Sequence, residues 1–287
     1  MLAVAVMLLV VGAITVAGRV AVMVNPTPVM VAAAPRVSDL QFTGTAQTAV
    51  LDYLSWDAAA PRAARTTALA RWGLTGQMGD GWDGTGQLSI ENAVPIAVSR
   101  TSEIGAVVTV QARTTLATPA PTTNSAASGA NWPGTSAVWL TVAVPVAVRG
   151  SRIFLTAPPA LVGAAPTQAL GAAVRVASDE DTDDGRATAE TVSKLITAYG
   201  SGDLEFVRGP GSSFTGLVGM VTGGQVLSWR MAKLGAGADS SLRAGDVTVL
   251  WTLPGEAGQL RSSYRIQLVQ RENRWLLQEI TPAVGNS

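Results

Sequence analysis

The densest group of charged side chains in the sequence is the acidic run "DEDTDDGRATAE" at residues 179–190. Four of its carboxylates stand at positions 1, 3, 5 and 12 of a calcium-loop pattern, and calcium prefers oxygen ligands. The sharp turn of such a loop needs glycine at position 6, but Asp184 stands there and Gly185 follows one place late. The alternative is a solvated linker whose charge suits the N-terminus of a following helix. We favour the linker and expect no metal. The four carboxylates are Asp179, Asp181, Asp183 and Glu190.

A second candidate chemistry is proton transfer, which requires a carboxylate and a tyrosine that converge in an apolar cavity. Asp52 lies on a predicted helix and Asp203 directly follows one, so ordinary surface or capping roles account for both. The sequence contains no histidine and no cysteine. This excludes Ser-His-Asp and Cys-His mechanisms and nearly every catalytic zinc site. We therefore predict that the chain is not an enzyme and uses no cofactor. The candidate groups are Asp52, Tyr53, Tyr199, Asp203 and Tyr264.

Two glycine-rich segments, "GDGWDGTG" at 79–86 and "RGPGSSFTG" at 208–216, resemble phosphate-binding loops in composition only. Neither has the Lys-Ser/Thr pair that follows a phosphate-binding loop. We interpret both as surface loops. Trp82 and Trp132 lie in loops, where an aromatic side chain often anchors a protein interface, so we predict both as possible interface residues.

Five of the six remaining tryptophans divide into two groups. Trp229, Trp251 and Trp275 fall within strand-like runs and are predicted to belong to the core. Trp56 and Trp72 lie near helix ends, where the sequence assigns no role. Lys and Arg total 20 and balance 20 Asp and Glu, so the net charge is zero. A neutral chain has no long-range attraction to polyanions, and we predict no direct binding of nucleic acid.

The N-terminal residues 1–24 are predicted to form a transmembrane helix. The first 18 residues carry no charge, and Arg19 stands near one end of the apolar stretch, where its long side chain can reach the interface. The alternative is a cleaved signal peptide, which usually has a basic start and a shorter apolar run. The apolar positions assigned to the anchor are Leu2, Val4, Val6, Leu8, Leu9, Val10, Ile14 and Val16.

The basic residues near this segment, Arg19 and Arg36, both follow it. Basic residues usually mark the cytoplasmic side, which would place the bulk of the chain inside the cell. Our hypothesis is that Met1 is not the native start and that a short basic tail precedes it. With that tail, the protein is predicted to cross the cell membrane once, with most of the chain on the extracytoplasmic side.

The 287 residues allow one large domain or two of ordinary size. We divide the chain into five parts by composition and periodicity. Residues 25–37 are proline-rich and predict an extended linker. Residues 161–185 are irregular and acidic and predict a linker between two modules. The five parts are an anchor at 1–24, a linker at 25–37, a first module at 38–160, a linker at 161–185 and a second module at 186–287.

Each module begins with helices and ends with strands. In the first, "TAQTAVLDYLSWDAAAPRAARTTALARWG" predicts two helices, with Pro61 at the start of the second and Gly73 at its stop. Strands follow at 88–100 and 104–116, where Ile104, Ala106, Val108 and Val110 are expected on one face and Thr109 on the other. Apolar residues alternate from 138 to 148, and Pro145 within that run predicts an edge strand or a bulge.

The second module repeats this order. A helix is predicted at 186–203, with Val192, Leu195, Ile196 and Tyr199 on one face. Strands are predicted within 225–235, 246–253, 264–270 and 274–281. Helices on one face of an antiparallel sheet form an α+β fold, and we predict this class for both modules. Within the predicted strand at 246–253, residues Val247, Val249, Trp251 and Leu253 share one face.

This layout resembles the nuclear transport factor 2-like fold, in which a curved antiparallel sheet forms a cone against helices. The runs that carry the resemblance are "TAVLDYLSWD", "AETVSKLITAYGSGDLEF" and "RWLLQEI". Two such modules behind one membrane helix resemble the TcpC-like conjugal transfer proteins, bitopic components of type IV secretion systems. None of these runs is a catalytic signature, so the resemblance assigns no functional residue.

The resemblance implies a non-catalytic, membrane-anchored scaffold of a conjugative DNA-transfer channel. Its expected partners are copies of itself, in a homo-oligomer, and other membrane proteins of the channel. The alternative is a membrane-tethered accessory module that binds a small molecule or lipid. That alternative requires a deep apolar pocket in one cone, and a cone filled by its own side chains would argue against it.

Overall fold

The computed structural model describes residues 37–116, 136–163, 180–235, 239–255 and 257–284. The predicted anchor and nearly all of the linker after it therefore lie outside the described residues. Arg36–Ser287 form one compact unit. Within the described ranges, no helix combines the length and apolarity needed to cross a membrane.

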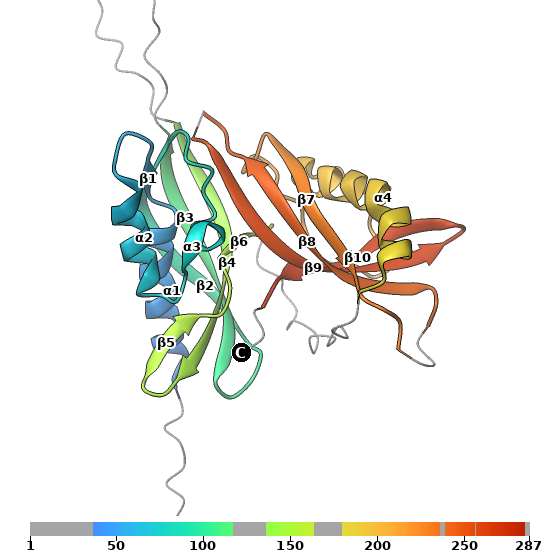
Figure 1. Cartoon of the computed structure of the whole chain (residues 1–287), viewed down its shortest axis with the longest axis horizontal. Helices are drawn as coiled ribbons and strands as arrows, with labels where there is room; N and C mark the ends of the chain where they lie inside the picture. The colour runs from blue at the N-terminus through green and yellow to red at the C-terminus, as the bar shows by residue number, and fades with distance from the viewer. Residues whose placement is uncertain (1–36, 117–135, 164–179, 236–238, 256, 285–287) are drawn as a thin grey trace, which may run out of the picture. The chain divides into compact units, whose positions relative to one another are not determined.

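The first half of this unit is an antiparallel sheet with three helices packed on it (Figure 1). The strand order is β1-β2-β3-β4-β5, and β6 pairs with β4 beside β5. The elements are α1 (Asp39–Tyr53), β1 (Trp56–Asp57), α2 (Arg62–Ala70), α3 (Gly76–Asp80), β2 (Gln87–Arg100), β3 (Gly105–Leu116), β4 (Ser136–Arg149), β5 (Arg152–Leu155) and β6 (Ala160–Leu161).

The second half is a four-stranded antiparallel sheet in the order β10-β9-β8-β7, with one helix packed against it (Figure 1). The α+β class predicted from the sequence is confirmed, and antiparallel sheets with few helices fit the nuclear transport factor 2-like arrangement. The elements are α4 (Thr182–Ser201), β7 (Gly223–Met231), β8 (Leu242–Thr252), β9 (Gln259–Arg271) and β10 (Arg274–Pro282).

The helix boundaries follow local sequence signals. α1 begins after a capping box in which the Ser38 side chain accepts from the Gln41 amide and the Gln41 side chain accepts from the Ser38 amide. Pro61 stands at the N-cap of α2, as predicted. Gly73 adopts a φ of 88°, which a glycine tolerates after a helix. α4 begins at Thr182, inside the stretch that composition marked as a linker.

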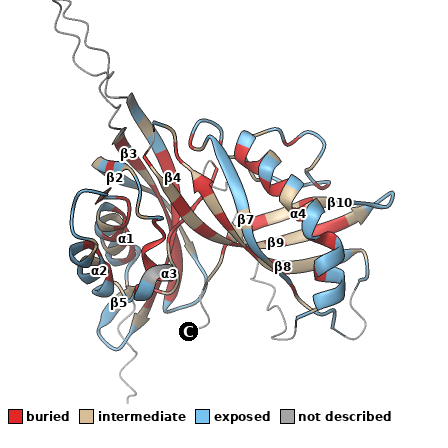
Figure 2. Cartoon of the chain, turned by 45° about the horizontal axis from the view of Figure 1, so that its top comes forward, coloured by how far each residue is buried: buried red, intermediate tan, exposed pale blue. Residues whose placement is uncertain are grey.

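Alternation along the strands places the core as predicted in most positions (Figure 2). The apolar residues of β8 and the predicted apolar face of α4 are buried. Two positions near β3 differ from the prediction. Ile104 precedes the strand and is 56% exposed, whereas Thr109 is buried although it lies on the face predicted to be polar. The second half of the chain covers that face, and Val284 packs there against Val107 and Ala143.

The prediction that Pro145 marks an edge strand or a bulge is wrong. β4 has β3 on one side and β5 and β6 on the other, and its register with β3 is unbroken. The carbonyl of Pro145 accepts from the Thr156 amide, which follows β5. The N–H and carbonyl of a strand residue point to the same side of the strand. The nitrogen of Pro145 therefore faces away from β3, at the position between the residues that pair with β6 and those that pair with β5. Proline costs no ladder bond there.

Arg65 of α2 holds the loops of the first half together. Its side chain is 9% exposed, and its two terminal nitrogens donate four hydrogen bonds of 2.6–3.0 Å to main-chain carbonyls. The guanidinium also lies 5.4 Å from the ring centre of Trp56 and 5.9 Å from that of Trp82. One side chain thereby joins the end of α1, the β1 turn and α3. The four carbonyls belong to Asp52, Tyr53, Ser55 and Asp80.

Residues 160–163 join the two sheets. β6 pairs with β4, and the Val162 amide donates to the Thr141 carbonyl. On the opposite side, the Leu161 amide donates to Ser262 Oγ at 3.2 Å, and the Tyr264 hydroxyl donates to the Leu161 carbonyl at 2.7 Å. The stretch predicted as an interdomain linker thus begins with buried residues. One cluster of buried apolar side chains runs through both sheets.

Two glycine-to-alanine substitutions should change stability in opposite directions. Gly44 lies on the exposed face of α1, and a Cβ there would meet nothing within 4 Å. Alanine should stabilise the fold by roughly 0.5–1 kcal/mol because it restricts the unfolded chain. Gly200 lies in α4, where a Cβ would stand 2.7 Å from the fully buried ring of Trp251. Gly200→Ala should destabilise by about 1–3 kcal/mol. Urea unfolding of both variants measures this, and equal shifts would contradict the packing.

Replacing Arg65 should destabilise the fold more than an exposed arginine does. Arg65→Met keeps much of the side-chain volume but leaves buried carbonyls without donors, which should cost about 2–4 kcal/mol. Arg65→Lys retains the charge, but a single ammonium cannot reproduce the planar fork, so it should fall between. Arg152→Met, at an exposed position of β5, serves as the matched control. Equal unfolding midpoints for Arg65→Met and the control would rule out this role.

Candidate interaction surface

The acidic run does not form a calcium loop in the described structure. Asp181 is the N-cap of α4, and its side chain accepts from the Asp184 amide at 3.1 Å. Asp183 and Asp184 lie in the first helical turn, where negative charge is favourable. The calcium interpretation is therefore wrong for these residues, since a helix occupies the positions of the loop. Asp179 lies outside the described residues. Among those that are described, no three metal-binding side chains gather in one place.

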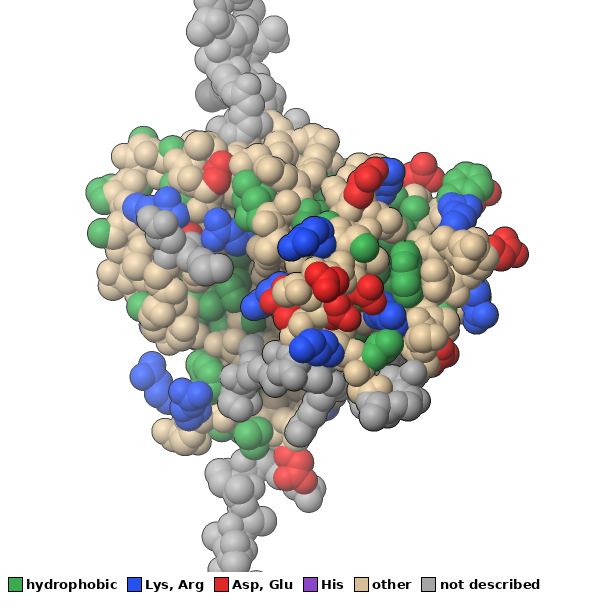
Figure 3. All heavy atoms as spheres, turned by 45° about the vertical axis from the view of Figure 1, so that its right-hand side comes forward, with side chains coloured by type: hydrophobic (Ala, Val, Ile, Leu, Met, Phe, Trp, Pro, Cys, Tyr) green, Lys and Arg blue, Asp and Glu red, His purple; other side chains and the backbone are tan. Residues whose placement is uncertain are grey.

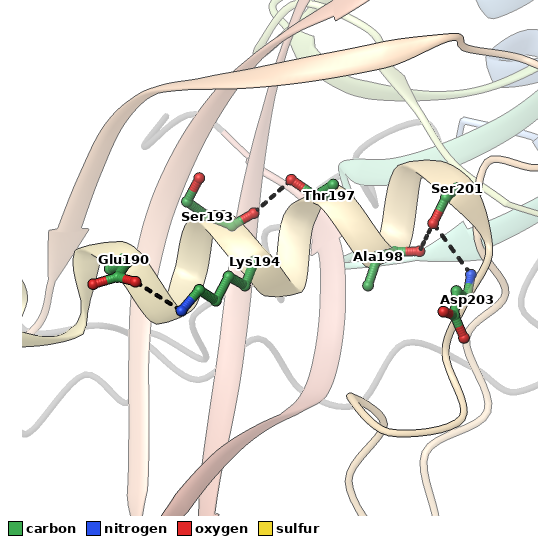
Figure 4. Close-up of a pocket in the computed structure, with 7 residues that line it drawn as sticks. All are labelled: Glu190, Ser193, Lys194, Thr197, Ala198, Ser201 and Asp203. Atoms are coloured by element: carbon green, nitrogen blue, oxygen red, sulfur yellow. Dashed lines mark hydrogen bonds and ion pairs between the residues drawn. The ribbon is translucent and has the colours of Figure 1, made fainter.

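The outer face of α4 carries a shallow, solvent-open depression of about 440 Å³ (Figure 4). The side chains of Glu190, Lys194, Thr197 and Ser201 bond to their own helix or to each other. Glu190 and Lys194 form an ion pair of 2.7 Å, and Lys194 lowers the pKa of Glu190 through this hydrogen bond and its charge. The Thr197 hydroxyl donates to the Ser193 carbonyl. This face is a polar, solvent-open helix surface.

A second depression of about 470 Å³ lies between the N-terminal half of α4 and strand β7. We call it the α4–β7 groove. Strand β7 supplies its apolar wall, and α4 supplies small and polar side chains. Figure 3 shows a group of acidic side chains near the middle of the face that it presents, with basic side chains around it. The residues that line the groove are Glu180, Thr182, Gly185, Arg186, Ala189, Ser193, Val226, Leu227, Ser228 and Trp229.

A hydrogen bond fixes the width of the groove. The Trp229 indole donates from Nε1 to Thr188 Oγ1 at 3.1 Å, and the Thr188 hydroxyl donates to the Asp184 carbonyl at 2.8 Å. Thr188 is 7% exposed. Asp184 also pairs with Arg243 of β8 at 3.3 Å. These bonds tie the first turns of α4 to the sheet.

The three candidate tyrosines are fully or almost fully buried, and each has a partner within the chain. The Tyr264 hydroxyl donates to Leu161 and accepts from Trp251 Nε1 at 2.8 Å. The Tyr199 hydroxyl accepts from the Gly163 amide at 3.2 Å. The Tyr53 hydroxyl faces the Arg261 carbonyl at 3.5 Å. Burial raises the pKa of all three phenols above its ordinary value, so they remain neutral donors and acceptors.

The two candidate carboxylates lie apart from these phenols. Asp52 forms an ion pair with Arg71 and accepts from Trp72 Nε1 at 2.5 Å. Asp203 is exposed and follows the C-terminus of α4, where its amide donates to Ser201 Oγ. The geometry does not bring a free carboxylate and a tyrosine hydroxyl together among these five residues.

The predicted interface residue Trp82 is 6% exposed. Its ring stacks on Trp56 with centres 6.0 Å apart, and its main chain bridges to Leu260 of β9. It is therefore an internal contact within this chain and offers almost no surface to another molecule. The Trp56 indole donates to the Ala257 carbonyl at 2.8 Å, which adds a second link to the other half. Trp132 and the eight anchor positions lie outside the described residues.

The core prediction for the other tryptophans holds in the structure. Trp251 is fully buried, and Trp229 and Trp275 pack against the core while partly exposed. Sequence reasoning missed the α4–β7 groove and Arg65. Arg186, Ala189 and Ser193 do recur at helical spacing, but no pattern in the sequence shows that β7 faces them. Arg65 carries no signal of its own because its partners are main-chain carbonyls.

Comparison with protein-family models and with curated proteins gives no match. Among solved structures, one described as "Ntf2 like protein involved in plasmid conjugation" aligns with a TM-score of 0.37 and 17% sequence identity. The alignment covers 87% of this chain and 98% of that chain. The likeness at this TM-score is too low to carry an argument about function.

Removing the hydroxyl of Thr188 should loosen the groove. Thr188→Val leaves the Trp229 indole without its partner and should destabilise the protein by about 1–2 kcal/mol. Thr197→Val makes the same chemical change on the exposed face of the same helix and should leave stability within about 0.5 kcal/mol of the original. Urea unfolding followed by tryptophan fluorescence compares the two. The role assigned to this hydrogen bond is refuted if both variants unfold at the same midpoint.

Proposed function

We propose that this chain is a non-catalytic scaffold component of a conjugative type IV secretion channel. Residues 1–24 anchor it in the cell membrane, and the bulk of the chain lies on the extracytoplasmic side. It acts by binding copies of itself and other membrane proteins of the channel.

The proposal that the chain is not catalytic is supported by one observation: apart from Asp203, the side chains considered for acid–base chemistry are buried or already bonded to other parts of the chain. The hydroxyls of Tyr199 and Tyr264 bond to main-chain atoms of residues 161–163, and the phenol of Tyr53 is fully buried beneath α3. Asp52 is held by Arg71. Groups that bind the chain's own backbone so closely serve cohesion, which favours a scaffold over an enzyme.

Buried side chains fill the space between the second sheet and helix α4, which also favours a scaffold over a protein that binds a small molecule. Leu161, Tyr199, Trp251 and Tyr264 occupy the space between helix α4, β6 and β9, and each is 2% exposed or less. The depressions described above lie on the outside and are lined largely by polar or small side chains. Neither depression is the enclosed apolar pocket that a small-molecule or lipid site requires.

The conjugative role rests on the sequence layout: an apolar N-terminus, followed by two α+β halves whose helical parts contain the runs "TAVLDYLSWD" and "AETVSKLITAYGSGDLEF". The proposal therefore concerns the process of DNA transfer and leaves the individual partners to be found.

Transfer frequency from a donor cell lacking only this gene tests the proposal. We expect transfer to collapse and a copy of the full chain to restore it. A complementing copy with Asp52→Asn and Asp203→Asn should restore transfer equally, because a scaffold needs neither carboxylate as an acid or base. Immunoblotting of membranes checks that each version is present in equal amount.

Two results would contradict the proposal in different ways. Unchanged transfer without the gene would remove the conjugative role and favour the tethered small-molecule or lipid-binding module. Loss of transfer in the double Asn variant, at normal abundance, would point to proton-transfer chemistry and overturn the non-catalytic assignment.

A further inference from the structure

The outer edges of a β-sheet expose unpaired main-chain groups, and proteins usually cover or disrupt them. In the first sheet, the long edge of β2 is protected. Gln47 of α1 donates from Nε2 to the Ala93 carbonyl at 2.7 Å. Pro95 has no N–H to offer to a further strand. This edge is therefore poorly suited to pair with another strand.

The edges formed by β6 and β10 are covered by the chain itself. The hydroxyls of Ser262 and Tyr264 bind the outer main-chain groups of Leu161. On β10, the Gly209 amide donates to the Leu277 carbonyl at 2.8 Å, and the Leu277 amide donates to the Val207 carbonyl at 2.7 Å. The short β5 is met by the Trp72 carbonyl, which accepts from the Leu155 amide.

Strand β7 differs from these edges. It pairs with β8 on one side only, and on its outer side the Asp181 amide donates to the carbonyl of its last residue, Met231. Within the described part of the chain, no main-chain bond reaches the outer side of residues 223–230. The sequence of 223–229, "GGQVLSW", carries no charge, and Leu227 is 42% exposed. An uncharged, uncovered edge is a template for strand addition.

We propose that β7 pairs with β7 of a second copy of this chain, in antiparallel orientation about a twofold axis. This inference rests on the proposed function, since it names the surface through which the scaffold associates with itself. A twofold axis places each strand opposite its own sequence. Because residues 223–229 carry no charge, this pairing opposes no like charges, which would destabilise cross-strand neighbours. The first flanking charge is Arg230, which stands opposite the far end of the partner strand.

The α4–β7 groove provides apolar contact beside the paired edge. Val226, Leu227 and Trp229 line it from β7, and Ala189 and Ser193 of α4 leave room above them. The register shift between Val226 and Ser228 bends β7, so pairing is confined to short segments on either side of Leu227. The groove therefore adds side-chain contacts to a short main-chain ladder.

Cysteine crosslinking of the full chain in membranes tests this inference, because the sequence contains no cysteine and the background is empty. Single variants Gln225→Cys, Leu227→Cys and Ser228→Cys, and equal mixtures of two variants, sample the possible registers. Opposed residues in an antiparallel pair lie about 4.5–5.5 Å apart at Cα, within the reach of a disulfide. Mild oxidation should give a covalent dimer with at least one variant or mixture. Ser89→Cys, an exposed serine on β2, should remain monomeric.

A charge on the same edge provides the complementary test. Leu227→Lys added to Gln225→Cys or Ser228→Cys should abolish the disulfide, because it places a lysine of each copy on the paired edge, where the two positive charges repel each other. No dimer from any β7 variant, a dimer of equal yield from Ser89→Cys, or a crosslink to a protein of another size would overturn the inference. Formaldehyde crosslinking of unmodified cells and transfer frequency are scored in parallel. Self-association and transfer without a β7 disulfide would reject this surface and leave the proposed scaffold function standing.

Discussion

The buried main chain of residues 160–163 needs hydrogen-bond partners on both of its sides. One side bonds to the first sheet, and the other bonds to side chains of the second half. An unpaired amide or carbonyl in the interior costs roughly 1–3 kcal/mol. β4 supplies partners on one side. On the other side there is no strand, and the hydroxyls of Ser262, Tyr264 and Tyr199 take its place. The second half thus caps the edge of the first sheet.

Several other features follow from this junction. Two of the three tyrosines considered for an acid–base site, Tyr199 and Tyr264, bond to this segment. The Trp251 indole N–H donates to the Tyr264 hydroxyl and so helps to orient it. Trp251 in turn sets the tight packing against Gly200 of α4. Contacts from the first half reinforce the joint: the Arg261 amide donates to the Gly81 carbonyl at 2.6 Å. Arg65 holds that loop in place by binding the Asp80 carbonyl just before it. In the described chain, no main-chain bond reaches the outer side of residues 223–230 of β7.

The sequence predicts features that depend on local periodicity and fails where distant segments meet. Alternation located β8 and β9, helical spacing located the buried face of α4, and Pro61 marked the start of α2. Thr109 is buried because the second half covers it, and Trp82 is internal because β9 lies beside it; neither partner is near in sequence. Pro145 fits a gap between two partner strands, which no single-strand pattern reveals. The acidic run caps a helix because the Asp181 side chain accepts from the Asp184 amide at the start of α4.

Amide hydrogen exchange at Leu161 and Gly163 tests most directly whether the buried segment makes the two sheets one unit. If the junction holds them together, these two amides should be protected as strongly as the central amides of β9, since opening the segment would require the sheets to separate. Measurement on the full chain, resolved to single residues, provides the comparison. Rapid exchange at Leu161 and Gly163 alongside strong protection in β9 would contradict the account, because the segment would then be an ordinary connection between two independent halves.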